Sequence, residues 1–437
     1  MAAEGDTVRD HEAADAALPD VPEASGLGPG GDVKWMLAAT LVAGVAGYLV
    51  MWNAIRVLGQ ADYVVFGVFW SALFLVVGVL FGLQQETTRA TAEALRSAAR
   101  PVRRSSLWLF GAGAGVIVGV IVLATSPLWA PGSLGEENSA LAVQVAVGSA
   151  ANAVVATMSG AMAGAQRWKL LAAVILLDAL IRLLAVSLVL SVTGDPTMFA
   201  WAIVLPFPLA ITIVFCCAPR VLRRLGHSPF GYRTLARNSM HTVIAASATA
   251  VLINGFPLVL AFYAQSGEEE TLGALIFAIT LTRAPILVPM MALQSYLVTR
   301  FTNDRDALWA FMLKAMGAIA ATMAVLAVVT WLWGYWALVT FVRPDLNLST
   351  AALVPLVVSS GFIGMLCVTG PALLALDKHR DYALGWVIAS VVALAVLFVP
   401  LPLEFRASLA LSVGPIVGIA WHLVRIRVAL RERVTTA

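Results

Sequence analysis

The chain of 437 residues carries little charge: 12% of its residues are Asp, Glu, Lys or Arg, whereas 60% are hydrophobic. An ordinary soluble domain carries about 25% charged residues, so this composition argues against a water-soluble globular protein. Segments this apolar bury their surface in lipid, where each backbone polar group has to be bonded within the membrane-spanning structure. The composition therefore predicts an integral membrane protein.

Cysteine is also scarce. Cys216 and Cys217 are neighbours in one apolar run, and Cys367 lies in another. Adjacent residues of a helix point about 100° apart, so neither a disulfide framework nor a metal site is predicted. The chain further lacks a phosphate-binding glycine-rich loop, zinc-ligand spacing and a nucleophile elbow. We therefore expect no ATP hydrolysis, no cofactor and no enzymatic activity.

Lysine occurs four times against twenty-four arginines. This bias is typical of GC-rich bacterial genomes, so we expect a bacterial plasma membrane. Residues 1–33 hold eight acidic residues, three prolines and a glycine-rich stretch. A positively charged region followed by a short apolar run is missing there, which excludes a signal peptide. The composition predicts a disordered, acidic cytoplasmic tail over residues 1–33.

Twelve apolar runs are each long enough to cross about 30 Å of hydrocarbon. They cover residues 35–58, 63–84, 106–129, 140–164, 170–193, 198–218, 239–264, 274–298, 308–334, 351–376, 382–402 and 408–429. The long connection after the sixth run divides the chain into two halves of six helices, which is the layout of a duplicated transporter. We predict an all-α membrane protein of about twelve transmembrane helices, with an N-terminal lobe (34–218), a basic cytoplasmic linker (219–238) and a C-terminal lobe (239–437).

The distribution of Lys and Arg predicts the orientation. With the N-terminus inside, the cytoplasmic segments hold twenty-three of the twenty-eight basic residues, and the outer side holds Arg56, Arg343 and Arg406. Both termini are therefore expected to be cytoplasmic. The charged stretch from Glu86 to Arg104 either extends the second helix along the inner leaflet or only fixes topology. Nucleic-acid binding is not expected, because the basic residues flank spans and lack interleaved aromatic residues.

Three ionisable residues lie clearly within spans, where a charge needs a partner or an aqueous cavity. Asp178 and Arg182 are four residues apart on the fifth span, so they share one helical face. One interpretation is a static ion pair that lets two charges enter the membrane together. The other is a coupling element of the transport pathway that is protonated or changes partner during the cycle, since Asp178 is the only acid within a span.

Arg283 lies near the middle of the eighth span and has no acid three or four residues away. A guanidinium group suits phosphate oxygens, because its donors form a planar fork with a permanent charge. We hypothesise that Arg283 faces an aqueous cavity and receives an anion. The alternative is a bond to Asp178 or to a carbonyl of another helix. Pro285 and Pro289 predict a bend beside the arginine.

Three further polar residues are weaker candidates for substrate binding. Asn53 and Arg56 lie near the outer end of the first span, and Asn254 lies in the seventh. Arg56 can equally extend its long side chain to the membrane surface. Asn254 can equally form a hydrogen bond between helices.

Three short motifs lie in the first, second and eighth spans. The stretch Leu58-Gly59-Gln60-Ala61-Asp62-Tyr63, followed by Phe66-Gly67, is similar to LG-x-x-x-Y-G-x-F; Phe81-Gly82-Leu83 with Arg89 is similar to LGL…R; and Ala278, Leu281 and Pro285 match A-x-x-L-x-x-x-P. These motifs resemble those of polysaccharide flippases of the multidrug/oligosaccharidyl-lipid/polysaccharide exporter superfamily. One departure is Val64, which stands where a glycine often follows the tyrosine. The twelve-helix count and the division into halves agree over residues 35–430.

The resemblance implies two six-helix lobes around a central cavity that opens to one leaflet and then to the other by alternating access. It implies a flippase that moves a polyprenyl-(pyro)phosphate-linked oligosaccharide from the inner to the outer leaflet for cell-envelope polysaccharide biosynthesis. Arg283 would hold the anionic headgroup, and Asn254, Asn53 and Arg56 would line the path. The implied partners are the lipid-linked glycan, membrane lipids and envelope glycosyltransferases or a polymerase.

Other functions fit the sequence less well. A drug/cation antiporter of the same superfamily predicts acids in the cavity, but this chain has a single carboxylate in its spans. A membrane glycosyltransferase or polymerase needs catalytic groups on the outer face, and the first outer loop extends only from Gly59 to Asp62. A major-facilitator carrier needs a G-x-x-x-D-R-x-G-R-R pattern, which is absent between Gln84 and Ser105.

Overall fold

The computed structural model describes residues 30–96, 105–264, 267–305, 307–346 and 348–436. Most of the predicted acidic tail and residues 97–104 of the charged stretch lie outside the described residues. The described part of that stretch continues the second pass as a helix to Arg96.

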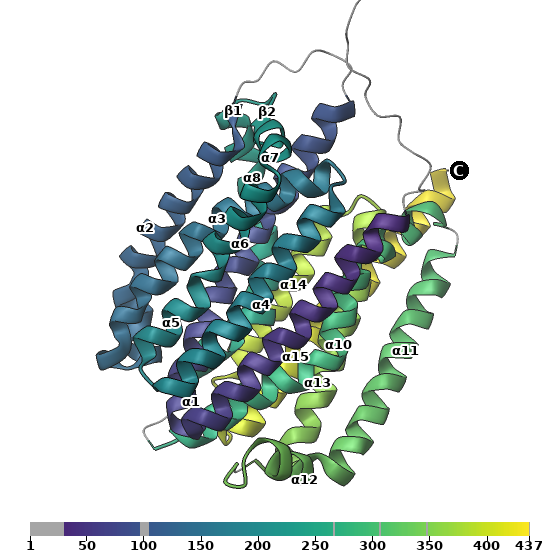
Figure 1. The fold of residues 1–437 in the computed structure, drawn as a ribbon. Coiled ribbons are helices and arrows are strands. Elements are labelled where there is room, and N and C mark those ends of the chain that lie inside the picture. The colour runs from purple at the N-terminus through teal and green to yellow at the C-terminus, as the bar shows by residue number, and fades with distance from the viewer. Residues whose placement is uncertain (1–29, 97–104, 265–266, 306, 347, 437) are drawn as a thin grey trace, which may run out of the picture.

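The chain folds almost entirely into helices (Figure 1). The first half contains α1 (Gly30–Arg96), β1 (Ser105–Ser106), α2 (Leu107–Leu134), η1 (Glu136–Leu141), α3 (Ala142–Gly164), α4 (Trp168–Val192), α5 (Pro196–Val204) and α6 (Pro206–Cys217). The connection contains α7 (Pro219–Leu225) and β2 (His227–Ser228). The second half contains α8 (Tyr232–Ala250), η2 (Val251–Gly255), α9 (Phe256–Ala261), α10 (Glu269–Asn303), α11 (Leu308–Val329), η3 (Thr330–Gly334), α12 (Tyr335–Ala337), η4 (Leu338–Val342), α13 (Thr350–Ala375), α14 (His379–Val396) and α15 (Leu403–Thr436).

The helix α1 consists of two membrane passes that meet at Gly59. This residue has φ 86° and ψ 176°, a conformation that glycine adopts without steric penalty. The Tyr63 hydroxyl donates a hydrogen bond to the Met51 sulfur at 3.1 Å. Twelve residues of a straight helix would separate these groups by about 18 Å, so the chain reverses between them. We call residues 30–58 the first arm of α1 and residues 60–96 the second arm.

The twelve-helix prediction is confirmed. Among the described residues, ten helices are long and apolar enough to cross a membrane, with α1 taken as one of them. Counting both arms of α1, and including the eighteen-residue α14 that packs along α15, gives twelve passes. The sixth pass is broken at Leu205 into α5 and α6, and the seventh begins at Tyr232 rather than at residue 239.

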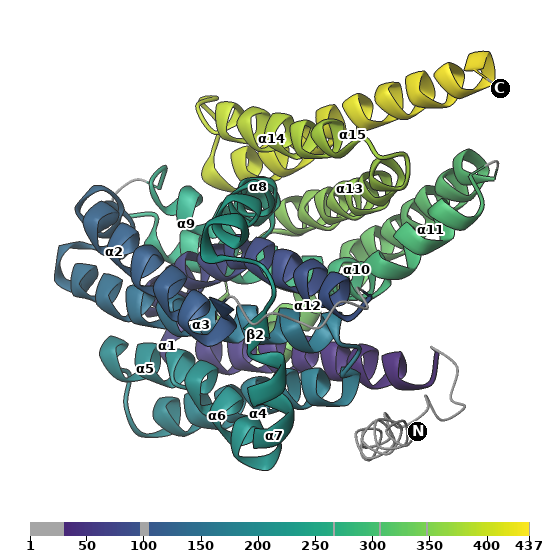
Figure 2. The same ribbon diagram turned by 90° about the horizontal axis from the view of Figure 1, so that it is seen from above.

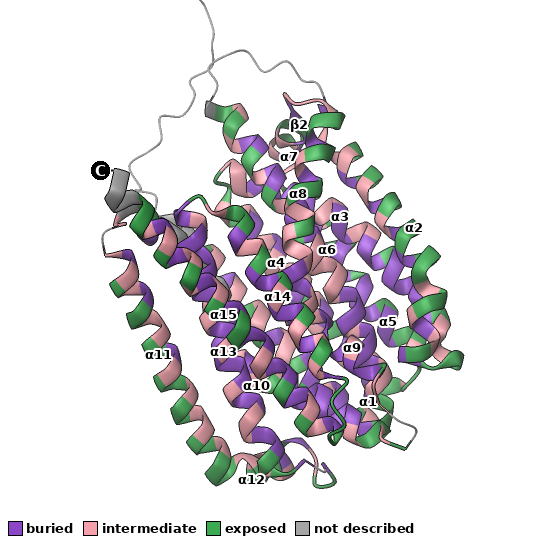
Figure 3. Cartoon of the chain, turned by 180° about the vertical axis from the view of Figure 1, so that it is seen from behind, coloured by how far each residue is buried: buried purple, intermediate pink, exposed green. Residues whose placement is uncertain are grey.

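The passes form two lobes, as expected. In the N-terminal lobe α1 packs against α3 and α4, and α2 packs against α3. In the C-terminal lobe α13 contacts α10, α11 and α15. Seen from above, the lobes lie side by side, and α11 stands at the edge of its lobe (Figure 2). The residues of α11 are mostly exposed or half-buried, whereas buried residues fill the helices between the lobes (Figure 3).

The second arm of α1 and the pass α8–η2–α9 form a seam between the lobes. A side chain at Gly82 would come within 2.5 Å of the Thr242 backbone, and the Thr242 hydroxyl donates to the Gly82 carbonyl at 2.7 Å. Further along, the Ser71 hydroxyl donates to the Asn254 carbonyl at 2.5 Å and accepts from the Leu258 N–H at 3.1 Å. These bonds satisfy backbone groups around η2, where a π-helical turn interrupts the α-helical pattern.

The two ends of the bundle differ in charge. The start of α1, the end of α15, the short β1–β2 sheet and α7 lie at the same end (Figure 1). We call it the basic end, because it carries the arginines Arg89, Arg220, Arg223, Arg224, Arg233, Arg425 and Arg427. The helix α12 lies at the other end (Figure 1). The turn at Gly59 lies there too, because Trp52 and Arg56 of the first arm bond Phe341 and Arg343, which follow α12, and we call this the Gly59 end.

Candidate functional site

Arg283 of α10 is buried between helices, and its exposed fraction is 5%. Its Nη1 atom donates to the Ile253 carbonyl of η2 at 2.7 Å. Its Cζ atom lies 5.9 Å from the ring centre of Phe256. Its Nε and Nη2 atoms are buried and have no hydrogen-bond partner among the described residues. The guanidinium group thus keeps a free donor edge.

The local sequence explains this geometry. Pro285 and Pro289 lie inside α10, where each removes a backbone donor just after the arginine. The π-helical turn of η2 directs the Ile253 carbonyl at Nη1. The helix α10 also packs against α1, which belongs to the N-terminal lobe. Arg283 is therefore placed where the two lobes meet.

The sequence left open whether Arg283 bonds Asp178 or a carbonyl of another helix. Arg283 bonds a carbonyl of another helix, but this bond uses only one of its three nitrogen atoms. Asp178 pairs with Arg182 instead. A buried charge with unsatisfied donors is destabilising unless an anion or water completes its bonds. This arrangement suits the binding of an anion by Nε and Nη2.

The weaker candidates lie in different environments. Asn254 follows Ile253 in η2, is half-buried, and its side-chain nitrogen faces Gly78 of the second arm of α1. Asn53 donates from Nδ2 to the Ser187 hydroxyl of α4 at 3.2 Å, within the N-terminal lobe. Arg56 is exposed, and its Cζ lies 4.7 Å from the ring centre of Trp52. Asn254 therefore belongs to the same turn as the carbonyl that binds Arg283, whereas Asn53 and Arg56 contact residues of the N-terminal lobe.

Asp178 and Arg182 form the predicted pair on α4, with Arg182 Nη2 2.6 Å from Asp178 Oδ1. Arg182 Nε also donates to the Ile203 carbonyl at 3.2 Å. The arginine lies against three aromatic rings, those of Trp70, Phe74 and Phe207, at 5.9, 5.1 and 4.6 Å from their centres. Sequence reasoning missed these rings, although the spacing of Trp70 and Phe74 by one helical turn was visible. The pair is well satisfied within the N-terminal lobe.

Sequence reasoning also missed a set of bonds between the lobes at the Gly59 end. The Trp52 indole donates to the Phe341 carbonyl at 2.9 Å, and Gln60 Nε2 donates to the Asp345 carbonyl at 2.6 Å. Arg343 donates to both carboxylate oxygens of Asp345 at 2.8 Å. Its Nη1 donates to the Arg56 carbonyl at 3.1 Å. We call these bonds the latch, because they join the two arms of α1 to the segment before α13.

Loss of the latch is expected to separate the lobes at this end. Arg343→Ala removes the bond to the first arm and the bidentate pair that orients Asp345. Spin labels at Asp62→Cys and Ser349→Cys, in a chain whose three native cysteines are replaced, should report a longer and broader distance distribution. Arg406→Ala is the control and should leave the distance distribution unchanged, because Arg406 bonds the Tyr263 carbonyl within its own lobe. Equal distributions in the wild type and Arg343→Ala would show that the latch does not hold the lobes.

The latch should also respond to acid. The hydrogen bonds from Arg343 hold the pKa of Asp345 below its ordinary value. The carboxylate therefore stays ionised, and the latch stays closed, as the pH falls through the usual Asp range. Below the lowered pKa the carboxylate is protonated, and the label distance should lengthen toward that of Arg343→Ala.

Comparison with known proteins places the chain among mycobacterial relatives. No protein-family model matches it. It is 33% identical over 404 residues to the uncharacterized protein Rv3630 of Mycobacterium tuberculosis, with 90% of this chain and 91% of the relative covered. It is 33% identical over 395 residues to the uncharacterized protein Rv1510 of the same species, with the same coverage.

Solved structures show the same fold. The chain is similar to an inward-facing MATE family multidrug resistance transporter of the MOP superfamily, with a TM-score of 0.70, 15% identity, and coverage of 91% of this chain and 99% of the other. It is also similar to the lipid II flippase MurJ in an inward closed conformation, with a TM-score of 0.68, 11% identity, and coverage of 90% of this chain and 87% of the other. A third similar structure is a MOP superfamily transporter from Pyrococcus furiosus with a binding pocket of reverse polarity, with a TM-score of 0.63, 15% identity, and coverage of 91% of this chain and 96% of the other. The predicted resemblance is confirmed at the level of fold.

Proposed function

Because the chain belongs to the same family as these mycobacterial proteins and has the fold of MOP superfamily transporters, we propose that it is a flippase for a lipid-linked oligosaccharide. It moves a polyprenyl-(pyro)phosphate-linked glycan from the inner to the outer leaflet for cell-envelope polysaccharide biosynthesis. The basic end faces the cytoplasm, as the distribution of Lys and Arg predicts.

One observation carries this proposal: where the lobes meet, Arg283 presents two buried donors that have no hydrogen-bond partner among the described residues. Nε and Nη2 lie on one edge of the guanidinium fork, which matches two oxygen atoms of a phosphate group. The Ile253 carbonyl fixes the third nitrogen and so orients this edge. A diphosphate or monophosphate headgroup would complete the bonds of the arginine, while its lipid tail stays in the bilayer.

The same observation argues against export of a cationic drug. A cation needs an unneutralised acid along its path. In the spans predicted from the sequence the acid concerned is Asp178, and Arg182 neutralises it at 2.6 Å. MurJ is named as a flippase of lipid II, which gives this fold a precedent for a lipid-linked substrate.

The proposal includes the route of the headgroup. The latch joins the lobes at the Gly59 end, so in the proposed cycle the headgroup enters from the basic end, where the bond between Thr242 and Gly82 has to open, and binds Arg283. The lobes then rock so that the Gly59 end opens, as in other transporters with two related halves. Envelope glycosyltransferases would supply the substrate, and a polymerase or ligase would receive it.

Translocation in proteoliposomes tests the function. A fluorescent polyprenyl-pyrophosphate oligosaccharide is incorporated in both leaflets, and a membrane-impermeant reductant bleaches the accessible half. The protein should make the protected half accessible, but should leave an uncharged polyprenyl glycoside protected. Transport of cationic dyes without movement of the pyrophosphate-linked glycan would reject the proposal.

A further inference from the structure

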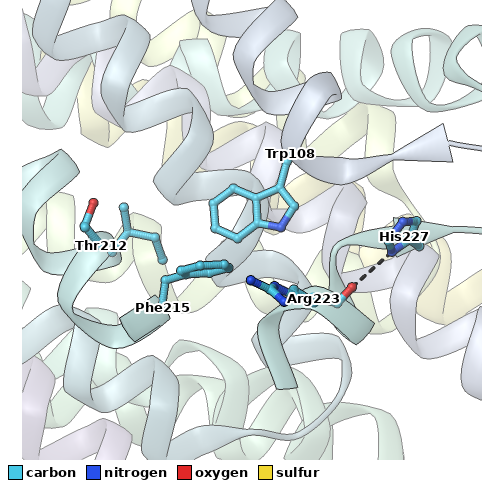
Figure 4. A pocket seen from close by; sticks show the side chains of 6 residues that line it. Trp108, Thr212, Phe215, Arg223 and His227 are labelled. Atoms are coloured by element: carbon cyan, nitrogen blue, oxygen red, sulfur yellow. Dashed lines mark hydrogen bonds between the residues drawn. The ribbon is translucent and has the colours of Figure 1, made fainter. Parts of the chain in front are cut away.

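A pocket of about 370 Å³ lies at the basic end of the N-terminal lobe, apart from Arg283. It is lined by Trp108 of α2, by Ile211, Thr212 and Phe215 of α6, and by Arg223 and His227 of the connection (Figure 4). Its floor is apolar and aromatic, and its two ionisable residues come from the segment that follows α6. None of these residues takes part in the proposed path of the glycan.

The pocket has a fixed shape. The rings of Trp108 and Phe215 meet edge to face, with centres 5.6 Å apart. Trp108 also covers Gly226, where a side chain would come within 2.5 Å of the indole nitrogen. The Leu107 N–H donates to the Gly226 carbonyl at 2.9 Å. These contacts hold the start of α2 against the connection and form one wall of the pocket.

The polar side of the pocket carries unneutralised positive charge. The Cζ atom of Arg223 lies 5.9 Å from the ring centre of Phe215, and no carboxylate of the described chain pairs with Arg223. The ring of His227 lies at the backbone of Arg223 and bonds the Arg223 carbonyl at 3.0 Å, whereas the guanidinium group points toward Phe215 (Figure 4). Arg220 and Arg224 of the same short helix are exposed nearby. A ligand with a negative head is therefore favoured.

The depth of the pocket matches the boundary between hydrocarbon and headgroups. Trp108 is the second residue of a spanning helix, and Phe215 lies two residues before the end of another. Arg223 lies beyond both ends, in α7. An apolar slot inside the hydrocarbon with a basic mouth just outside it is complementary to one acyl chain and one phosphate of a lipid.

We propose that this pocket, which we call the lipid pocket, binds an anionic phospholipid of the leaflet at the basic end. The phosphate group is held by Arg223 and faces His227, and an acyl chain lies over Trp108, Ile211 and Phe215. The site is separate from the proposed glycan site, because no residue lines both. A bound lipid would tie α2 and α6 to α7 and so stabilise the N-terminal lobe.

Quenching of Trp108 fluorescence tests this proposal in nanodiscs. Phosphatidylglycerol with brominated acyl chains, diluted in unlabelled phosphatidylcholine, is compared with brominated phosphatidylcholine. The contribution of Trp108 is the part of the quenching that Trp108→Phe lacks. Quenching of Trp108 should be greater with brominated phosphatidylglycerol than with brominated phosphatidylcholine. Arg223→Gln should lower this preference for phosphatidylglycerol by about fivefold. Arg224→Gln, which removes the same charge from the same helix outside the pocket, should retain the preference.

Equal quenching by the two brominated lipids would overturn the proposal, because it indicates contact with bulk lipid only. An equal loss of the preference for phosphatidylglycerol in Arg223→Gln and Arg224→Gln would overturn the proposal as well, because it indicates a diffuse basic surface. Displacement of the preference by inorganic phosphate at constant ionic strength would identify an anion site rather than a lipid site. Native mass spectrometry of phosphatidylglycerol binding to Arg223→Gln and Arg224→Gln gives a second measurement that leaves Trp108 intact, and equal lipid binding by both would contradict the proposal.

Discussion

Arg283→Gln is expected to reduce translocation of a pyrophosphate-linked glycan by at least about 100-fold. Charge-assisted hydrogen bonds are worth about 1.5–3 kcal/mol each, and the substitution removes two donors aimed at the headgroup together with the charge. Arg283→Lys restores the charge but not the planar fork, so it should recover only part of the activity. The measurement is the initial rate of headgroup exposure in proteoliposomes.

The matched control for this prediction is Arg300→Gln on the same helix. Arg300 is paired with Asp304 at 2.9 Å and is about one-third exposed, so its loss should leave the rate nearly unchanged. Thermal unfolding in detergent shows whether each variant is folded. A folded Arg283→Gln protein that translocates the glycan at the wild-type rate would remove the basis for the anion site.

Asp178→Asn is expected to destabilise the N-terminal lobe by about 3–5 kcal/mol. The substitution leaves the Arg182 charge buried without its counter-ion, which is the costly way to break a buried pair. Replacing both residues, as Asp178→Leu with Arg182→Met, should recover most of the stability. Denaturant titration in mixed micelles measures the free energy of unfolding. Glu93→Gln is the control, because Glu93 forms an exposed pair with Arg89 that is worth at most about 1 kcal/mol.

The double variant also separates the two interpretations of the pair. If the pair is only structural, the stable double variant should translocate the glycan at a near-normal rate. If the pair couples transport to an ion, the double variant should be folded but inactive. Asp178→Asn with wild-type stability would contradict the buried-pair account, whatever its activity.

Much of the fold was predictable because lipid constrains the sequence so strongly. Runs of about 20 apolar residues located the passes, and their number agrees with a division into two lobes. The details that were missed depend on single residues. Gly59 alone turns α1 back on itself, so the predicted loop from Gly59 to Asp62 is helical from Gln60 onward. The seventh pass starts seven residues early because Tyr232 to Asn238 continue the same helix.

The candidate site was predictable in part for a similar reason. Charges within spans are rare, so Arg283, Asp178 and Arg182 were found directly, and the spacing of four residues gave the ion pair. The partners of these charges were not predictable, since they are backbone carbonyls and rings from distant segments, such as Ile253 and Phe207. Hydrogen bonds between the lobes, such as the one from Gln60 to Asp345, leave no periodic signal in a sequence.

The most direct test of the anion site is a structure of the protein with a bound polyprenyl-pyrophosphate saccharide. The account predicts phosphate oxygens within hydrogen-bond distance of Arg283 Nε and Nη2, with Nη1 still bonded to the Ile253 carbonyl. A phosphate group bound elsewhere, with the Arg283 donors satisfied by protein groups, would contradict it.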